Sequence, residues 1–280
     1  MNSRISGDIF EYYVVYVLNM MRVKTHNKYT IEKSEKLLYK MDIGTSMITI
    51  GKRLVLFKKI SRFVKTIGLI NTYELINEHV GSIGDATDIR CWVANVPINI
   101  SLKRNNHSIK HQRPSNLGRQ LQMTVTVIEY NLRYKNLNDK WFKLFNVDKF
   151  SEISKIDKFR MYTEFNNLYA HYININQDCR YQYINFLLAN NIQNKYIMEW
   201  KDTKNHLLIY DCKTLNYPDV MYAEVDGNNI ILEFFIGDDL PYITLKLRLH
   251  NASKYITNSL SLKYDTTIID IKNIYKTTII

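Results

Sequence analysis

The chain has 280 residues, 46% of them hydrophobic, which is enough for one large domain or two modest ones. The sparse 9 glycines and 4 prolines argue against a long flexible linker. The 3 cysteines, widely spaced and without a CxxC pair, argue against a disulfide framework or a zinc site and favour a reducing cytoplasm. The net charge of +11 favours a polyanionic partner, although a genome rich in Lys, Asn, Ile and Tyr codons produces the same excess.

The N-terminal part of the chain is predicted to be helical. Apolar residues recur at helical spacing over 5–22 and indicate an amphipathic helix that begins near Gly7 or Asp8. The apolar run at 12–21 is too short to cross a bilayer, so we expect no membrane segment. The glycines near Lys52 do not have the spacing of a phosphate-binding loop, so we expect no nucleotide cofactor. Further helices are expected over 31–40, 52–66 and 71–80.

The pattern then changes to short strands. "TDIRCWV" (87–93) and "INISLK" (98–103) are rich in β-formers, and "ANVP" between them is typical of a turn. We therefore expect two adjacent strands. Pro114 is suited to the first turn of a helix and predicts one over 114–121.

The remainder is predicted to be helical and then β-rich, which makes the fold class mixed α and β. "DGNN" at 226–229 is a strong hairpin turn. The order of elements suggests a core with a helical N-terminal part and a helical insertion over 1–200, and a β-rich region over 201–280. The expected helices are 150–172 and 178–191, and the expected strands are 206–212, 219–225, 230–236 and 241–249.

Asp88 and Lys103 form the pair with the clearest chemical meaning. Ser101 and Lys103 lie two apart on one predicted strand and share a face, while Asp88 begins the preceding strand and can approach them with some stagger or bulge. A divalent metal held by carboxylates activates water, and a neighbouring lysine stabilises the negative charge that develops on a phosphate. The alternative is a turn-forming aspartate and a surface lysine.

A basic segment follows this strand. No Asp or Glu occurs between Ile89 and Ile128, so the positive charge is local. Lys and Arg bind phosphates, and Asn, Gln and Arg recognise base edges, so this segment is predicted to contact DNA unless it is only a solvated loop. His107 and His111 are spaced to share a helical face, but they lack a third ligand for zinc. The predicted DNA contacts are Arg104, Asn105, Asn106, His107, Lys110, His111 and Arg113.

Three short motifs in order, "GDATDI" (84–89), "ISLKRN" (100–105) and "KHQR" (110–113), resemble type II restriction endonucleases of the PD-(D/E)xK superfamily, closest to the HaeIII-like group. The resemblance implies a small mixed sheet flanked by helices and Mg²⁺-dependent cleavage of double-stranded DNA at a short site, four base pairs and GC-rich. It also implies that Asp88 binds the metal and that Lys103 is catalytic.

The sequence departs from the superfamily at Ser101, where an acid is usual, and a hydroxyl contributes at most a hydrogen bond. Glu11 is the leading replacement acid, because "GDIFEYYVVYVL" resembles the entry helix that brings a glutamate to the metal. Asp85 is the second candidate. An exposed acid in the first helical turn, favoured by the helix dipole, is the alternative interpretation of Glu11.

Together these features predict a magnesium-dependent type II restriction endonuclease. Cleavage of both strands makes a homodimer attractive. Two alternatives stay open: a DNA-binding protein without catalytic activity, and a repair or recombination nuclease of the same superfamily.

Overall fold

The computed structural model describes residues 3–44, 50–76, 87–104, 108–188, 194–201, 203–213, 215–237, 240–272 and 276–279. The chain forms two compact units, each built from several segments. Unit 1 comprises Met1–His107, Ala189–Leu215 and Asn273–Ile280, and unit 2 comprises Ser108–Leu188 and Asn216–Lys272. The chain thus crosses between units several times, whereas we predicted one division after residue 200.

Unit 1 is built on a six-stranded mixed sheet in the order β1-β2-β3-β5-β6-β11. β3 and β5 are parallel and every other neighbouring pair is antiparallel. The first segment of unit 2 separates these two parallel strands in the chain, which supplies the long connection that a parallel pair requires. The strands are β1 (Ile70–Leu75), β2 (Ile89–Val93), β3 (Val96–Arg104), β5 (Lys195–Lys201), β6 (His206–Asp211) and β11 (Lys276–Ile279).

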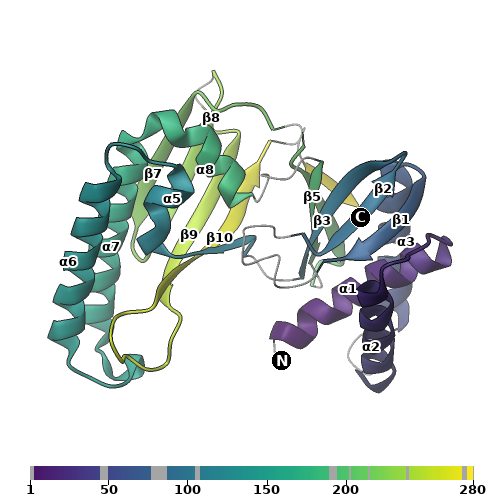
Figure 1. Ribbon diagram of the computed structural model, residues 1–280, viewed down its shortest axis with the longest axis horizontal. Coiled ribbons are helices and arrows are strands. Elements are labelled where there is room, and N and C mark those ends of the chain that lie inside the picture. The colour runs from purple at the N-terminus through teal and green to yellow at the C-terminus, as the bar shows by residue number, and fades with distance from the viewer. Residues whose placement is uncertain are drawn as a thin grey trace. The chain divides into compact units, whose positions relative to one another are not determined.

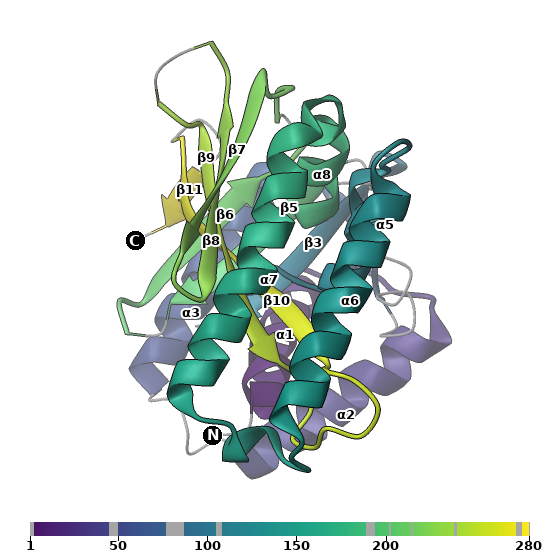
Figure 2. The same cartoon turned by 90° about the vertical axis from the view of Figure 1, so that its left-hand side faces the viewer.

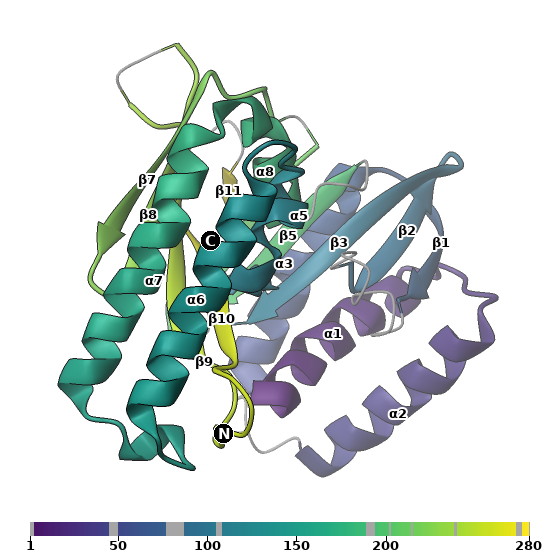
Figure 3. The same ribbon diagram turned by 60° about the vertical axis from the view of Figure 1, so that its left-hand side comes forward.

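Three helices accompany this sheet: α1 (Ser3–Met20), α2 (Lys28–Gly44) and α3 (Ile50–Ile67). Figures 1 and 3 show α1 beside the sheet, and α1 packs against α2, α3 and β3. The apolar stripes of α1 and α3 and one face of the strands form a single core, which includes Phe10, Val14, Ile100, Trp200 and Leu207. We call this the helix-covered face, and the opposite face the second face.

The expected helix over 71–80 is wrong, because Ile70–Leu75 forms β1 and pairs with β2. Tyr73 and Leu75 lie two apart and are both buried, which is the periodicity of a strand. Residues 77–80 of that prediction lie outside the described residues. The expected strands at 87–93 and 98–103 are confirmed as β2 and β3, joined by a turn at Ala94 and Asn95. Both turn residues have positive φ, as a tight two-residue hairpin turn requires.

Unit 2 is a five-stranded antiparallel sheet, in the order β4-β10-β9-β8-β7, with helices packed on it. Figure 2 shows α6 and α7 running side by side, and α7 contacts β7, β8 and β9. The predicted hairpin at "DGNN" is confirmed between β7 and β8. The strands are β4 (Lys110–Gln112), β7 (Val220–Asp226), β8 (Asn229–Phe235), β9 (Ile243–Asn251) and β10 (Leu262–Ile271); the helices are α5 (Leu117–Leu121), α6 (Val127–Phe145), α7 (Lys155–Ile175) and α8 (Arg180–Leu187).

The mixed α and β class is therefore confirmed. None of the helices within the described part of the chain is long and apolar enough to cross a membrane.

Candidate functional site

Asp88 is fixed at the start of β2 by its neighbour β3. Ile89 pairs with Ile100, so regular antiparallel register places Asp88 opposite Ser101 without the bulge that we expected. The Leu102 N–H donates to Asp88 Oδ2 at 2.6 Å, and the Ser101 hydroxyl donates to the same oxygen at 3.4 Å. The Asp88 carboxylate, one residue before β2, therefore accepts a backbone N–H of β3. Asp88 and Ser101 meet as predicted, with Ser101 serving as a hydrogen-bond donor.

Glu11 lies on α1 and is buried, with only 9% of its surface exposed. The helix begins at Ser3, more than one turn earlier than predicted, so Glu11 is not a first-turn acid and that alternative is wrong. Burial of a carboxylate requires a compensating charge. Lys33 on α2 supplies it, donating to Glu11 Oε1 at 2.5 Å.

Lys33 also connects Glu11 with Asp88. Burial alone would lower the pKa of Lys33, but the charge and hydrogen bond of Glu11, with smaller contributions from Tyr29 and Asp88, raise it above its ordinary value. The ammonium group thus experiences two carboxylates from different elements of unit 1. Lys33 was missed by sequence reasoning, because its contact with Glu11 spans 22 residues and no local motif marks it.

Lys103 extends from the second face of β3 and is partly exposed. It pairs with Glu199 in the parallel β3–β5 register. Glu199, which the sequence did not reveal as a site residue, is 7% exposed and forms an ion pair with Lys201, and it accepts a hydrogen bond from the Tyr210 hydroxyl at 3.4 Å. A carboxylate with its own lysine therefore lies directly beside Lys103.

The predicted DNA-binding residues do not all fall within one unit. Asp85 and Asn105, Asn106 and His107 lie outside the described residues, as does the side chain of Arg104. Lys110, His111 and Arg113 belong to unit 2, whereas Asp88 and Lys103 belong to unit 1. The three motifs of the resemblance therefore follow one another closely in sequence but are divided between the two compact units.

Within unit 2 these residues have different surroundings. The Lys110 ammonium lies 4.7 Å from the centre of the Phe186 ring, a cation–π contact with α8. His111 is on strand β4, so its spacing from His107 does not place it on a helical face. Its Nδ1 lies 2.6 Å from Asp265 Oδ1 on β10. Arg113 is exposed at the entry to the short helical turn of Pro114–Asn116.

Asp265 is the centre of an ion cluster in unit 2. Arg248 Nη2 lies 3.1 Å from Asp265 Oδ2, and His250 Nε2 lies 3.1 Å from Oδ1. Burial raises the pKa of this carboxyl, but the hydrogen bonds from His111 and Arg248 and the charges of His250 and His111 lower it overall, below its ordinary value. One carboxylate thus has three cationic or potentially cationic neighbours.

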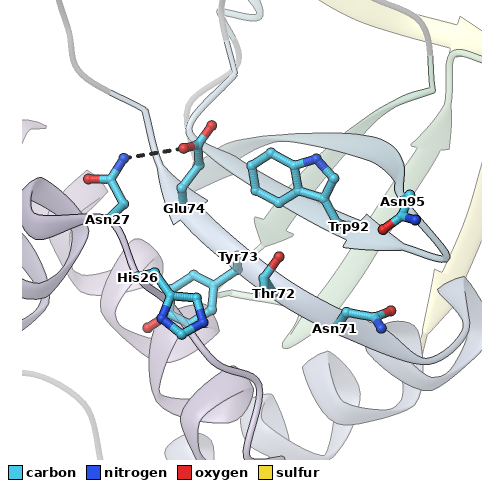
Figure 4. Close-up of a pocket in the computed structure, with 8 residues that line it drawn as sticks. All are labelled: His26, Asn27, Asn71, Thr72, Tyr73, Glu74, Trp92 and Asn95. Carbon is cyan, nitrogen blue, oxygen red and sulfur yellow. Dashed lines mark hydrogen bonds between the residues drawn. The ribbon is translucent and has the colours of Figure 1, made fainter.

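Two surface hollows are lined by described residues of unit 1, and the described lining of neither contains a residue predicted from sequence. One, of about 300 Å³, surrounds the side chain of Trp92 (Figure 4). There Asn27 donates to Glu74 Oε2 at 3.3 Å, and Arg90 bonds Glu74 Oε1, also at 3.3 Å. The other, of about 450 Å³, is lined by Lys201, Thr203, Lys204, His206, Leu208, Lys276 and Thr278.

No cluster of three or more His, Cys, Asp or Glu side chains that could hold a metal occurs in the described parts of the chain. Magnesium does not require such a cage, because one or two carboxylates suffice when water and a substrate phosphate complete its coordination. Glu11 and Asp88 are two oxygen donors whose charges both act on Lys33. Their number and chemistry fit magnesium.

Comparison with known proteins identifies no relative of this chain. No family model, curated protein or solved structure matches it.

Proposed function

We propose that this protein is a magnesium-dependent endonuclease that hydrolyses phosphodiester bonds of double-stranded DNA, with a core of the PD-(D/E)xK type. The observation that carries the proposal is the interaction of Glu11 and Asp88 with the one Lys33 ammonium group. Two acids far apart in sequence both raise the pKa of one lysine, and one of them, Asp88, is hydrogen-bonded to the strand that bears Ser101 and Lys103. This arrangement agrees with the resemblance to HaeIII-like restriction endonucleases. In this chain, Glu11 would replace the acid that is missing at Ser101.

In this proposal Glu11 and Asp88 hold the metal. Magnesium, when bound, supplies a hydroxide near neutral pH and neutralises charge on the phosphate. Asp88 is held in position by the Leu102 N–H and the Ser101 hydroxyl, so its second oxygen is the one oriented for a metal. Lys33 forms an ion pair with Glu11 and compensates its charge when no metal is present.

Lys103 acts on the substrate rather than on the metal. Its ammonium group donates to a non-bridging oxygen of the scissile phosphate, where negative charge grows as water adds to phosphorus and the ester oxygen leaves. Glu199, paired with Lys201, lies beside it and helps to orient the lysine chain. Removal of Lys103 should therefore affect the rate of cleavage more than the binding of DNA.

Cleavage of both strands at a short symmetric site favours a homodimer, because two identical active sites then face the two strands. A four-base-pair, GC-rich site is what the resemblance implies. We further propose that Lys110, His111 and Arg113 of unit 2 contact this DNA.

The test is digestion of long unmodified DNA by the full chain with and without Mg²⁺, followed by sequencing of the fragment ends. The proposal expects fragments that all end at one short sequence, and only with the metal. Glu11→Gln and Lys103→Ala should each reduce cleavage by about 10²-fold or more, while DNA affinity stays within a few-fold. Lys28→Ala, at a position whose side chain is 92% exposed, is the matched control.

Binding of DNA with no cleavage under any divalent metal would leave the protein as a DNA-binding protein and end the nuclease proposal. Cleavage at random positions would instead favour a repair or recombination nuclease.

A further inference from the structure

The larger hollow of unit 1, of about 450 Å³, is positively charged. Among the residues that the structure describes, its lining includes three lysines and a histidine, with two threonine hydroxyls and one leucine, and no carboxylate. We call this the basic hollow. Its residues come from the end of β5, the following turn, β6 and β11, so the sheet fixes their spacing.

The lysines of the basic hollow differ in their partners. Lys201 is neutralised by its ion pair with Glu199. Lys204 is exposed and Lys276 is partly exposed, and neither forms a salt bridge with a carboxylate among the residues that the structure describes. These two like charges repel each other unless an anion lies between them. His206 can donate an N–H to an oxygen anion in either of its charge states.

Strand register connects the basic hollow to Lys103. Lys103 pairs with Glu199 on β5, Glu199 with Leu208 on β6, and Leu208 with Thr278 on β11. Leu208 and Thr278 line the hollow, and paired side chains share one face of a sheet, so Lys103 and the hollow are both on the second face. Neighbouring strands are about 4.8 Å apart, which places Leu208 roughly 10 Å from the Lys103 strand.

We propose that the basic hollow binds a backbone phosphate of the DNA strand that is cut at Lys103, a few nucleotides from the scissile phosphate. DNA carries a negative charge about every 3.4 Å along each strand, so a site roughly 10 Å away falls within a few nucleotides. This inference rests on the proposed function. Lys204 and Lys276 bind the phosphate oxygens by charge, and the threonine hydroxyls and His206 complete the hydrogen bonds.

The test is the affinity of the full chain for a duplex oligonucleotide, measured with a metal chelator so that no cleavage occurs, over a range of salt concentrations. Lys204→Gln combined with Lys276→Gln should weaken binding by about tenfold or more near physiological salt, and should reduce the slope of log K against log salt by about 1 to 2, because each lysine releases about one counterion. The control is Lys58→Gln with Lys65→Gln, two exposed lysines of α3 on the helix-covered side. It removes the same charge and should leave the affinity within about threefold, since only non-local attraction is lost.

Equal losses in both double variants would overturn the inference, because general charge would then explain the binding. An unchanged affinity in the Lys204/Lys276 variant would overturn it as well. A parallel titration with inorganic pyrophosphate distinguishes a site for a free anion from a site for DNA. If the Lys204/Lys276 variant loses affinity for pyrophosphate but not for DNA, the hollow is not a DNA contact. Cleavage of DNA by the wild type with Mg²⁺ is measured separately and tests the nuclease proposal. That proposal can therefore stand if the basic hollow does not bind DNA. Conversely, an absence of cleavage does not change the measured effect of the Lys204/Lys276 variant on DNA affinity.

Discussion

The two units each contain a buried or partly buried ion cluster, and their charge balance is opposite. In unit 1, Lys33 forms an ion pair with Glu11, and the charge of Asp88 makes a smaller contribution to the raised pKa of Lys33. In unit 2, the single carboxylate of Asp265 is surrounded by His111, Arg248 and His250. A divalent cation could replace Lys33 and improve the balance in unit 1, whereas a cation added beside Asp265 would meet groups of its own sign.

This difference shows that acidic residues alone do not identify a metal site. Within the described part of the chain Asp265 has three ion-pair partners, yet its environment is suited to structure or to an anion. Asp88 uses one oxygen for β3 and contributes negative charge to a cluster with a surplus of acid. The ratio of acids to bases within reach, rather than the number of acids, separates the two clusters.

The largest expected effect tests this contrast directly. Asp88→Asn should reduce Mg²⁺-dependent DNA cleavage by about 10² to 10³-fold, because the metal loses a charged ligand while the amide oxygen can still accept the Leu102 N–H. Asp265→Asn should leave the cleavage rate within a few-fold. Both rates are measured under single-turnover conditions on one DNA fragment. Equal losses in the two variants would contradict the assignment of the metal to unit 1.

Sequence alone could predict the β2–β3 hairpin, because its alternation and turn chemistry are local. Because Asp88 comes directly before the first strand of this hairpin and Ser101 lies on the second, the hairpin also predicted that the two residues approach each other. β1 was missed because Ile70–Leu75 is short and becomes a strand only through its pairing with β2. The strand β4 was missed for the same reason, since its partner β10 lies some 150 residues further along the chain and the pairing carries no local signal.

The charge partners were beyond sequence reasoning altogether. Glu11 was named as the leading replacement acid, but nothing in its sequence neighbourhood identified Lys33 on another helix as its partner. Likewise, Glu199 comes beside Lys103 only because β3 and β5 are parallel neighbours, with the first segment of unit 2 between them in the chain. Side-chain identity was visible in the sequence, whereas the spatial pairing depends on tertiary packing.

The next effect concerns Lys33 and stability. Lys33→Met leaves the buried Glu11 carboxylate without its ion pair, and should lower the free energy of unfolding by about 2 to 3 kcal/mol without divalent metal. Millimolar Mg²⁺ should stabilise the variant by about 1 kcal/mol more than it stabilises the wild type, because the metal takes over the charge compensation. Urea denaturation with and without Mg²⁺ measures both values.

Lys28→Met provides the matched control on the same helix. Lys28 pairs with Glu32 at 3.9 Å on the surface, and its side chain is 92% exposed, so its loss should change stability by less than about 0.5 kcal/mol. If Mg²⁺ stabilises the Lys33 variant no more than the wild type, Glu11 and Asp88 do not attract the metal, and unit 1 loses its distinction from unit 2.

The smallest expected effect is a pH dependence in unit 2. The pKa of Asp265 is lowered in the folded protein, so its contribution to stability is present above the unfolded value of about pH 4 and is lost as the pH falls through the lower folded value. Asp265→Asn should therefore lower the free energy of unfolding by about 1 kcal/mol at neutral pH, with the difference fading below about pH 4. Urea denaturation at several pH values measures it.

Glu224→Gln, an exposed acid on β7 of the same sheet, should show no such pH-dependent difference. A stability loss in Asp265→Asn that persists unchanged at low pH would mean that packing, and not charge, gives Asp265 its role. The contrast between the clusters would then rest on unit 1 alone. If the difference fades as expected, charge rather than packing gives Asp265 its role beside His111, Arg248 and His250.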